Sequence, residues 1–134
     1  MSFLQKIKPE WPLRLGLGLM YIYSGFSLFS EPIYWVGFVP GWFDGLIANI
    51  MPVELFLRVQ GVGEFFVGLL FLAWFGGIWG TRIASILSSL SLAAIIVFVG
   101  VDLVTFRDVG LLGAAVALLV ISWSRNSLVG KEVV

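Results

Sequence analysis

Four long apolar stretches, separated by shorter polar or proline-containing segments, dominate the pattern along the chain. They run over about residues 13–29, 55–74, 82–101 and 109–123. Each approaches the ~20 residues that a helix needs to cross the ~30 Å hydrocarbon core of a bilayer. The pattern therefore predicts an all-α membrane protein, in which a bundle of four transmembrane helices forms a single multi-pass domain over residues 1–134.

The segment between the first two stretches, residues 30–53, interrupts this pattern with prolines and glycines. It remains rich in aromatic residues, which are Tyr34, Trp35, Phe38, Trp42 and Phe43. Irregular backbone cannot face hydrocarbon, and aromatic side chains favour the headgroup layer. We expect a short interfacial helix near residues 42–50. The wider segment 33–50 would then be either a membrane anchor or a lid over the bundle.

The second apolar stretch carries one acidic residue, Glu64, near its middle. Gly61, Glu64 and Gly68 share one helical stripe at positions i, i+3 and i+7. An ionisable group at the bilayer centre costs about 2.5–3.5 kcal/mol on insertion scales, so it usually faces the bundle interior. Because small residues let a second helix approach closely, we expect this stripe to face inward.

Helical rise places other polar residues at the depth of Glu64. At 1.5 Å per residue, Glu64 lies roughly 15 Å from one boundary of its span, while Tyr21 and Ser91 lie roughly 12 and 13 Å from the opposite boundary. The Glu64 carboxyl is therefore expected to bond to Tyr21 and to a serine of the third helix. The candidate ligand-binding residues are Glu64, Tyr21, Gly61, Gly68, Ser88 and Ser91. In the alternative interpretation, Glu64 is only a polar contact between helices.

The remaining charges lie near the ends of the apolar stretches. An outer polar cluster is predicted from Glu54, Arg58, Asp102, Arg107 and Asp108, either as a structural clasp or as a site for an anion or lipid headgroup. Arg14 and Arg82, at the other boundary, are expected to meet lipid phosphates. Because most basic residues fall on the side of the two termini, the positive-inside rule places both termini in the cytoplasm.

Composition narrows the chemistry further. The chain is 60% hydrophobic and 12% charged, against about 25% charged residues in soluble domains. Equal numbers of acidic and basic residues, without a long basic run, argue against nucleic acid as a partner. The absence of Cys and His excludes disulfides, haem ligation through His and the usual zinc sites. No nucleophile–base pair or phosphate loop is present, so we expect no catalytic activity from the chain on its own.

No small-residue cleavage motif follows the first stretch, which predicts an uncleaved first helix.

Several of these segments resemble the DoxX-like family of small membrane proteins, in order and along nearly the whole chain. They are LRLGLGLMYIYSGFSLF, GVGEFFVGLLFLAWFGG with its continuation TRIASIL, and FRDVGLLGAAVALL. The matching points are Gly61, Glu64, Gly68, Arg82, Ala84, Arg107 and Asp108. The resemblance implies a four-helix bundle in a prokaryotic-type plasma membrane. It also implies a link to quinone-dependent thiosulfate oxidation, in which some family members are named as subunits, or to oxidative stress responses.

Two departures from the family pattern bear on function. Ser27 and Leu28 stand where a lysine is expected, and the chain has no cysteine, which argues against direct thiol or sulfur chemistry. Our first hypothesis is a protein that binds a quinone or lipid between its helices, without a covalently bound cofactor. The alternative is a non-catalytic accessory subunit that docks partner proteins. Membrane lipid, partner subunits and further copies of the chain in a homo-oligomer are the expected partners. A proton-coupled transporter is disfavoured because the chain lacks a second intramembrane acid and inverted repeats.

Overall fold

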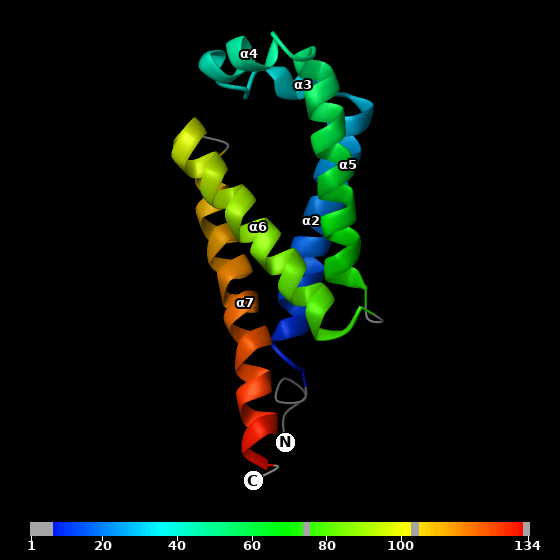
Figure 1. The fold of residues 1–134 in the computed structure, drawn as a ribbon, viewed down its shortest axis with the longest axis vertical. Coiled ribbons are helices and arrows are strands. Elements are labelled where there is room, and N and C mark those ends of the chain that lie inside the picture. Colours follow the sequence, from blue (N-terminus) through cyan, green and yellow to red (C-terminus); the bar gives the residue numbers. More distant parts are fainter. Residues whose placement is uncertain (1–6, 74–75, 103–104, 133–134) are drawn as a thin grey trace.

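The computed structural model describes residues 7–73, 76–102 and 105–132, and every regular element in these ranges is a helix (Figure 1). The helices are α2 (Glu10–Ser30), α3 (Ile33–Val36), α4 (Gly41–Ile47), α5 (Val53–Leu72), α6 (Gly77–Val99) and α7 (Phe106–Glu132). The prediction of an all-helical protein is confirmed. Two of the helices, α3 and α4, are short and lie in the segment that links the long helices α2 and α5.

Among the described residues, three helices are long and apolar enough to cross a membrane. They are Val53–Leu72, Gly77–Val99 and the part Phe106–Ser124 of α7. Large apolar side chains on the long helices point outward, as shown by Leu90 and Val97, which are 65% and 75% exposed. Such an apolar exterior is stable in hydrocarbon and not in water. The chain is therefore a multi-pass membrane protein. Helix α2 has a similar length but is less apolar, since it carries Arg14, two tyrosines and several serines.

The long helices form two antiparallel hairpins, α2 with α5 and α6 with α7. Figure 1 shows that the hairpins lie close together at the end that holds both termini and diverge toward the opposite end. We call these the terminal end and the far end. The short helices α3 and α4 lie across the far end, over the opening between the hairpins. In the far half of the molecule the backbones of α5 and α6 therefore diverge.

Several helix boundaries differ from the sequence prediction. Helix α2 begins at Glu10, because Pro12 lies within its first turn, where a proline removes no helical hydrogen bond. Helix α6 begins at Gly77, before the apolar stretch that starts at residue 82. Helix α7 continues to Glu132, beyond the apolar stretch that ends near residue 123. Hydropathy marks only the part of a helix that lies in hydrocarbon, so it misses a polar extension.

The buried core joins the two hairpins. It includes Leu17 and Tyr21 of α2, Phe71 of α5, Ala84 of α6 and Leu118 of α7, all at most 3% exposed. The rings of Tyr21 and Phe71 stack with their centroids 6.0 Å apart. Because all four long helices contribute to this core, it fixes the positions of the two hairpins relative to each other.

Glycines bring α2 and α5 into backbone contact. A Cβ atom built on Gly25 would lie 2.5 Å from the Phe65 amide nitrogen and 2.6 Å from the Gly61 carbonyl oxygen. One built on Gly68 would lie 2.9 Å from the Gly18 carbonyl oxygen. No side chain fits at such distances, so this seam depends on glycine at both levels. The sequence-predicted small-residue stripe at Gly61 and Gly68 therefore packs against α2.

Candidate functional site: a polar groove between α5 and α6

A groove of about 460 Å³ lies between α5 and α6, and Tyr21 of α2 reaches into it. Helix α5 supplies Phe56, Val59, Gln60, Gly63, Glu64 and Val67, and α6 supplies Leu87, Ser88 and Ser91. The volume falls within the range of about 300–1,000 Å³ that is usual for small-molecule sites. Val59 and Leu87 on the rim are 60% and 46% exposed. The groove therefore opens sideways, toward the surface that faces hydrocarbon.

The Glu64 carboxyl group is held by two donors. The Ser24 hydroxyl of α2 donates to Oε2 at 2.5 Å, and the Gln60 side-chain amide, one turn earlier on α5, donates to Oε1 at 3.0 Å. Glu64 is half-buried and forms part of the groove wall. Both oxygens thus have a fixed donor, which orients the carboxyl group while one side of it remains accessible from the groove.

Tyr21 presents a hydroxyl group from the other side. The Ser88 hydroxyl donates to the Tyr21 oxygen at 2.8 Å, and the Tyr21 ring is clamped by its stacking on Phe71. Tyr21 is 3% exposed, so its position is set by packing. Among the described residues, no hydrogen bond joins Tyr21 to Glu64. The two groups therefore act as separate polar points in one groove.

The structure brings together four of the six predicted ligand-binding residues. Tyr21, Glu64, Ser88 and Ser91 line the groove, whereas Gly61 and Gly68 face α2. The predicted partners of Glu64 were wrong, because they are Ser24 and Gln60 and not Tyr21 and a serine of α6. A polar residue at i−4 on the same helix is a signal that could have identified Gln60. Ser24 gave no comparable signal.

Helix α4 closes the far end of the groove region. Its Trp42 packs on Phe98 near the end of α6, with ring centroids 5.8 Å apart. The neighbouring Phe43 packs on Phe56 of α5, with centroids 5.2 Å apart, and Phe56 itself lines the groove. These contacts place α4 across both walls, as seen in Figure 1. Of the two interpretations of residues 33–50, this arrangement favours the lid.

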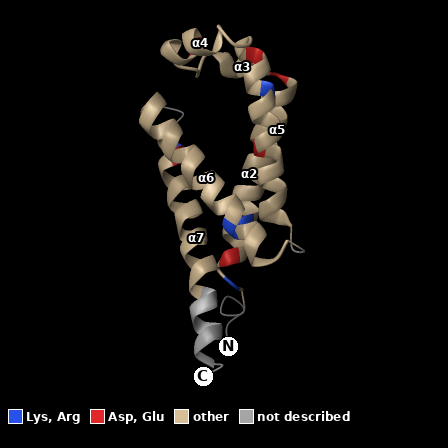
Figure 2. Cartoon of the chain, in the orientation of Figure 1, with Lys and Arg blue, Asp and Glu red and all other residues tan. Residues whose placement is uncertain are grey.

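The predicted outer polar cluster is divided between the two hairpins. Figure 2 shows charged residues at the start of α5 in one hairpin and others, partly hidden behind α6, in the second hairpin. Glu54 and Arg58 belong to the start of α5, and Arg58 donates to the Phe29 carbonyl of α2 at 2.7 Å. Asp102 instead accepts from the Thr105 amide at 2.8 Å in the loop before α7. Asp102 therefore belongs to the α6–α7 hairpin, whereas Glu54 and Arg58 belong to the α2–α5 hairpin. Sequence order alone does not show that the two hairpins diverge.

Beyond the loop that holds Asp102, Arg107 and Asp108 lie in the first turn of α7, in the same hairpin as Asp102. The predicted single site for an anion or headgroup, formed from all five residues, is therefore not assembled.

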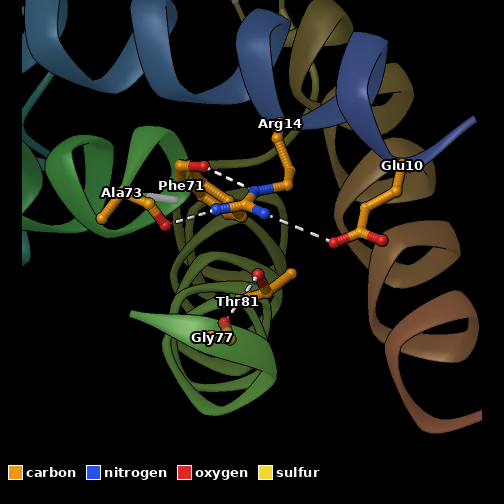
Figure 3. A network of polar contacts seen from close by, with 6 residues as sticks. All are labelled: Glu10, Arg14, Phe71, Ala73, Gly77 and Thr81. Atoms are coloured by element: carbon orange, nitrogen blue, oxygen red, sulfur yellow. Dashed lines mark hydrogen bonds and ion pairs between the residues drawn. The ribbon is translucent and has the colours of Figure 1, made fainter. Parts of the chain in front are cut away.

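Arg14 is a buried cation at the terminal end, and it has a structural role. Figure 3 shows its guanidinium group between α5 and Glu10. Its Nε and Nη2 atoms each donate at 2.7 Å to the carbonyls of Phe71 and Ala73, and Nη1 lies 3.4 Å from Glu10. The last carbonyls of a helix have no partner within that helix, and a cation stabilises them. The expectation that Arg14 meets lipid phosphates is therefore wrong.

Arg82 connects α6 to α7 in a similar way. Its Nη2 atom donates to the Ser122 carbonyl at 2.9 Å, and its guanidinium lies over the rings of Trp79 and Trp123, at 5.2 and 4.6 Å from their centroids. Only 3% of Arg82 is exposed. Arg82 is therefore enclosed by protein, where a lipid phosphate was expected.

The chemistry that the groove offers is hydrogen bonding. Its polar groups are hydroxyls, one amide and one carboxyl, which donate and accept hydrogen bonds. Within the described ranges, no group of three or more His, Cys, Asp or Glu residues could hold a metal ion. An apolar groove with a few convergent polar groups is the usual form of a small-molecule site.

Comparisons with protein families, with curated proteins and with solved structures gave no match to this chain.

Proposed function

We propose that this protein is a DoxX-like membrane protein with four spans that binds a hydrophobic ligand, a quinone or a lipid, in the groove between α5 and α6. The observation that carries the proposal is the convergence of polar side chains from three helices on an otherwise apolar groove. These side chains are Tyr21, Gln60, Glu64 and Ser88. Polar groups at the middle of a span are costly, which favours a functional reason for gathering them there.

The fourth span in this proposal is α2. It runs antiparallel to α5 with backbone contacts at Gly18 and Gly25, and Arg14 near its start bonds to the end of α5. A helix packed along the length of a membrane-spanning neighbour must lie at the same depth. Arg14 would then sit at the boundary of the hydrocarbon core, with its charge enclosed by α5 and Glu10.

A role as the membrane subunit of a quinone-linked redox system agrees with these features. The chain has no cysteine or histidine, so electrons would be carried by the bound ligand or by a partner subunit. The excess of basic residues on the side of the termini supports a plasma membrane orientation with both termini in the cytoplasm. In this role the chain positions the ligand for a partner and performs no catalysis on its own.

Substitution Glu64→Gln tests the proposal. It keeps the size of the side chain, and we expect roughly a tenfold to hundredfold loss of retained ligand, since a hydrogen bond to a charged or strongly polar group contributes about 1.5–3 kcal/mol. The measurement is a native mass spectrum of protein released from nanodiscs made from the host membrane. Glu54→Gln is the matched control, because Glu54 lies on the same helix but is exposed and outside the groove.

A bound mass that persists unchanged in Glu64→Gln would overturn the assignment of the site. A spectrum of bare protein for the unsubstituted chain would overturn ligand binding itself. Thermal unfolding in detergent should be similar for both variants, which separates loss of ligand from loss of the fold.

The second candidate function is an accessory subunit that docks partner proteins, and the exposed aromatic residues of the far end favour it. Tyr34 and Trp42 are 70% and 52% exposed on α3 and α4. In this case, replacing residues 33–50 by a short polar linker would abolish co-purification of partner subunits, while Glu64→Gln would leave it unchanged.

A further inference from the structure

The hydrogen-bonding groups in the groove specify the kind of head that a ligand needs, and this inference rests on the proposed function. Tyr21 accepts a hydrogen bond from Ser88, and among the described residues no protein group accepts the proton of the Tyr21 hydroxyl. The Ser91 hydroxyl also lines the groove without a protein partner in the described ranges. A ligand head is therefore met by at least one free donor and must contain an acceptor.

Glu64 supplies the opposite requirement. Ser24 and Gln60 each donate one hydrogen bond to its oxygens, but the lone pairs of a carboxyl group allow more than two, whether it is charged or neutral. The carboxyl group therefore has remaining capacity to accept on the side of the groove. A ligand head that also donates a hydrogen bond would satisfy it. The smallest group that both donates and accepts is a hydroxyl.

The depth of the groove limits the charge of the head. Glu64 is eleven residues into α5, roughly 16 Å from its start, at the middle of the apolar span. A phosphate or other ionic head would have to leave the headgroup layer to reach it, and charges at this depth are expensive. Among the groups that line the groove, none is basic. The site is therefore unsuited to a phospholipid headgroup and suited to an uncharged head.

The route of entry follows from the aromatic contacts of α4. Trp42 on Phe98 and Phe43 on Phe56 cover the far end, while the exposed rim residues Val59 and Leu87 leave the side open. A ligand therefore reaches the groove from the hydrocarbon layer. Such a ligand needs a long apolar body that remains in the hydrocarbon while the head enters between α5 and α6.

We propose that the groove takes an uncharged, long-chain amphiphile with a hydroxyl head, which donates to Glu64 and accepts from Tyr21. A membrane alcohol and a quinol share this chemistry. Four probes distinguish the sources and the competing heads: 1-hexadecanol, hexadecyl methyl ether, decylhydroquinone kept reduced, and hexadecyl phosphate. The ether retains an acceptor but no donor, and the phosphate carries charge.

The experiment measures the fraction of full-length protein that binds each probe, by native mass spectrometry from phosphatidylcholine nanodiscs. We expect at least one hydroxyl probe to bind about fivefold to tenfold more tightly than the ether, which corresponds to one lost hydrogen bond. Preference between hexadecanol and decylhydroquinone then identifies the source. Tyr21→Phe should weaken the hydroxyl probe by a similar factor. Tyr23→Phe is the matched control, because Tyr23 lies on the same helix, is 75% exposed and does not line the groove.

Equal binding of the ether and the hydroxyl probes, or stronger binding of hexadecyl phosphate, would overturn the hydroxyl inference and leave the proposed function intact. Equal losses in the Tyr21 and Tyr23 variants would overturn the role of Tyr21. If none of the four probes binds and no native ligand is retained, both the hydroxyl inference and the proposed function fail.

Discussion

The two interfaces of α5 contrast sharply. On one side, α5 packs against α2 through Gly61 and Gly68, at distances that leave no room for a side chain. On the other side, α5 and α6 diverge around a groove with polar walls. One helix thus combines a close backbone seam with an open interface. Gly61 and Gly68 of α5 therefore serve helix packing, while Gln60 and Glu64 line the groove.

We expect the two interfaces of α5 to affect two different measurable properties, the free energy of unfolding and the retention of ligand. Changes in the α2–α5 seam should lower the free energy of unfolding, whereas changes in the groove should alter ligand retention and leave stability nearly unchanged. Both quantities should therefore be measured for every variant.

Arg14→Leu should have the largest effect on stability. It removes the cation that binds the carbonyls of Phe71 and Ala73, and one partner of the Glu10 carboxylate. Removing one partner of a buried ion pair typically costs about 3–5 kcal/mol. Thermal or denaturant unfolding in detergent measures the loss. Arg58→Leu is the comparison, because Arg58 is exposed and, among the described residues, bonds only the Phe29 carbonyl. Equal losses in the two variants would contradict the importance of burial.

Gly25→Ala should have the next largest effect. The added Cβ would meet the backbone of Phe65 and Gly61 at 2.5–2.6 Å, so α2 and α5 must separate. We expect a loss of about 1–3 kcal/mol in unfolding free energy, as for other overpacked sites. Gly16→Ala, on the same helix with open space around it, should be neutral or stabilising by up to about 1 kcal/mol. A destabilising Gly16→Ala would show that helix backbone, and not the seam, determines the response.

Ser24→Ala should have the smallest effect on stability, about 1 kcal/mol or less. It removes the donor to Glu64 Oε2 but leaves Gln60 on the other oxygen. The freed carboxyl group should shift ligand retention in the native mass spectrum more than it shifts the unfolding midpoint. Ser30→Ala serves as the control, because that exposed hydroxyl bonds to the Phe26 carbonyl of its own helix. A large loss of stability without a change in retention would place Ser24 with the seam residues.

Sequence patterns predicted the elements and their depths because both depend on local spacing. The apolar runs located the long helices, and a rise of 1.5 Å per residue placed Tyr21, Glu64 and Ser91 at one level. Rise gives depth but not the direction in which a side chain points around its helix. For that reason, the bond from Ser24 to Glu64 could not be predicted, although all three candidate residues line one groove.

The arginines show a second limit of sequence reasoning. A cation near the end of a span can meet a lipid phosphate or the free carbonyls of a neighbouring helix. Hydropathy does not distinguish these partners. The choice depends on which helix ends lie side by side, and that is a property of the tertiary fold. In Arg14 and Arg58, the carbonyls of the partner helix are the acceptors.

Reciprocal bonds at the two ends of the α2–α5 pair have a mechanical consequence. Arg14 ties the start of α2 to the end of α5, and Arg58 ties the start of α5 to the end of α2. A slide of one helix along the other by one turn, about 5.4 Å, would break both ties at once and displace the facing glycines. We therefore expect α2 and α5 to move as one rigid unit with a fixed register. A widening of the groove would then come from a tilt of the α6–α7 hairpin against this unit.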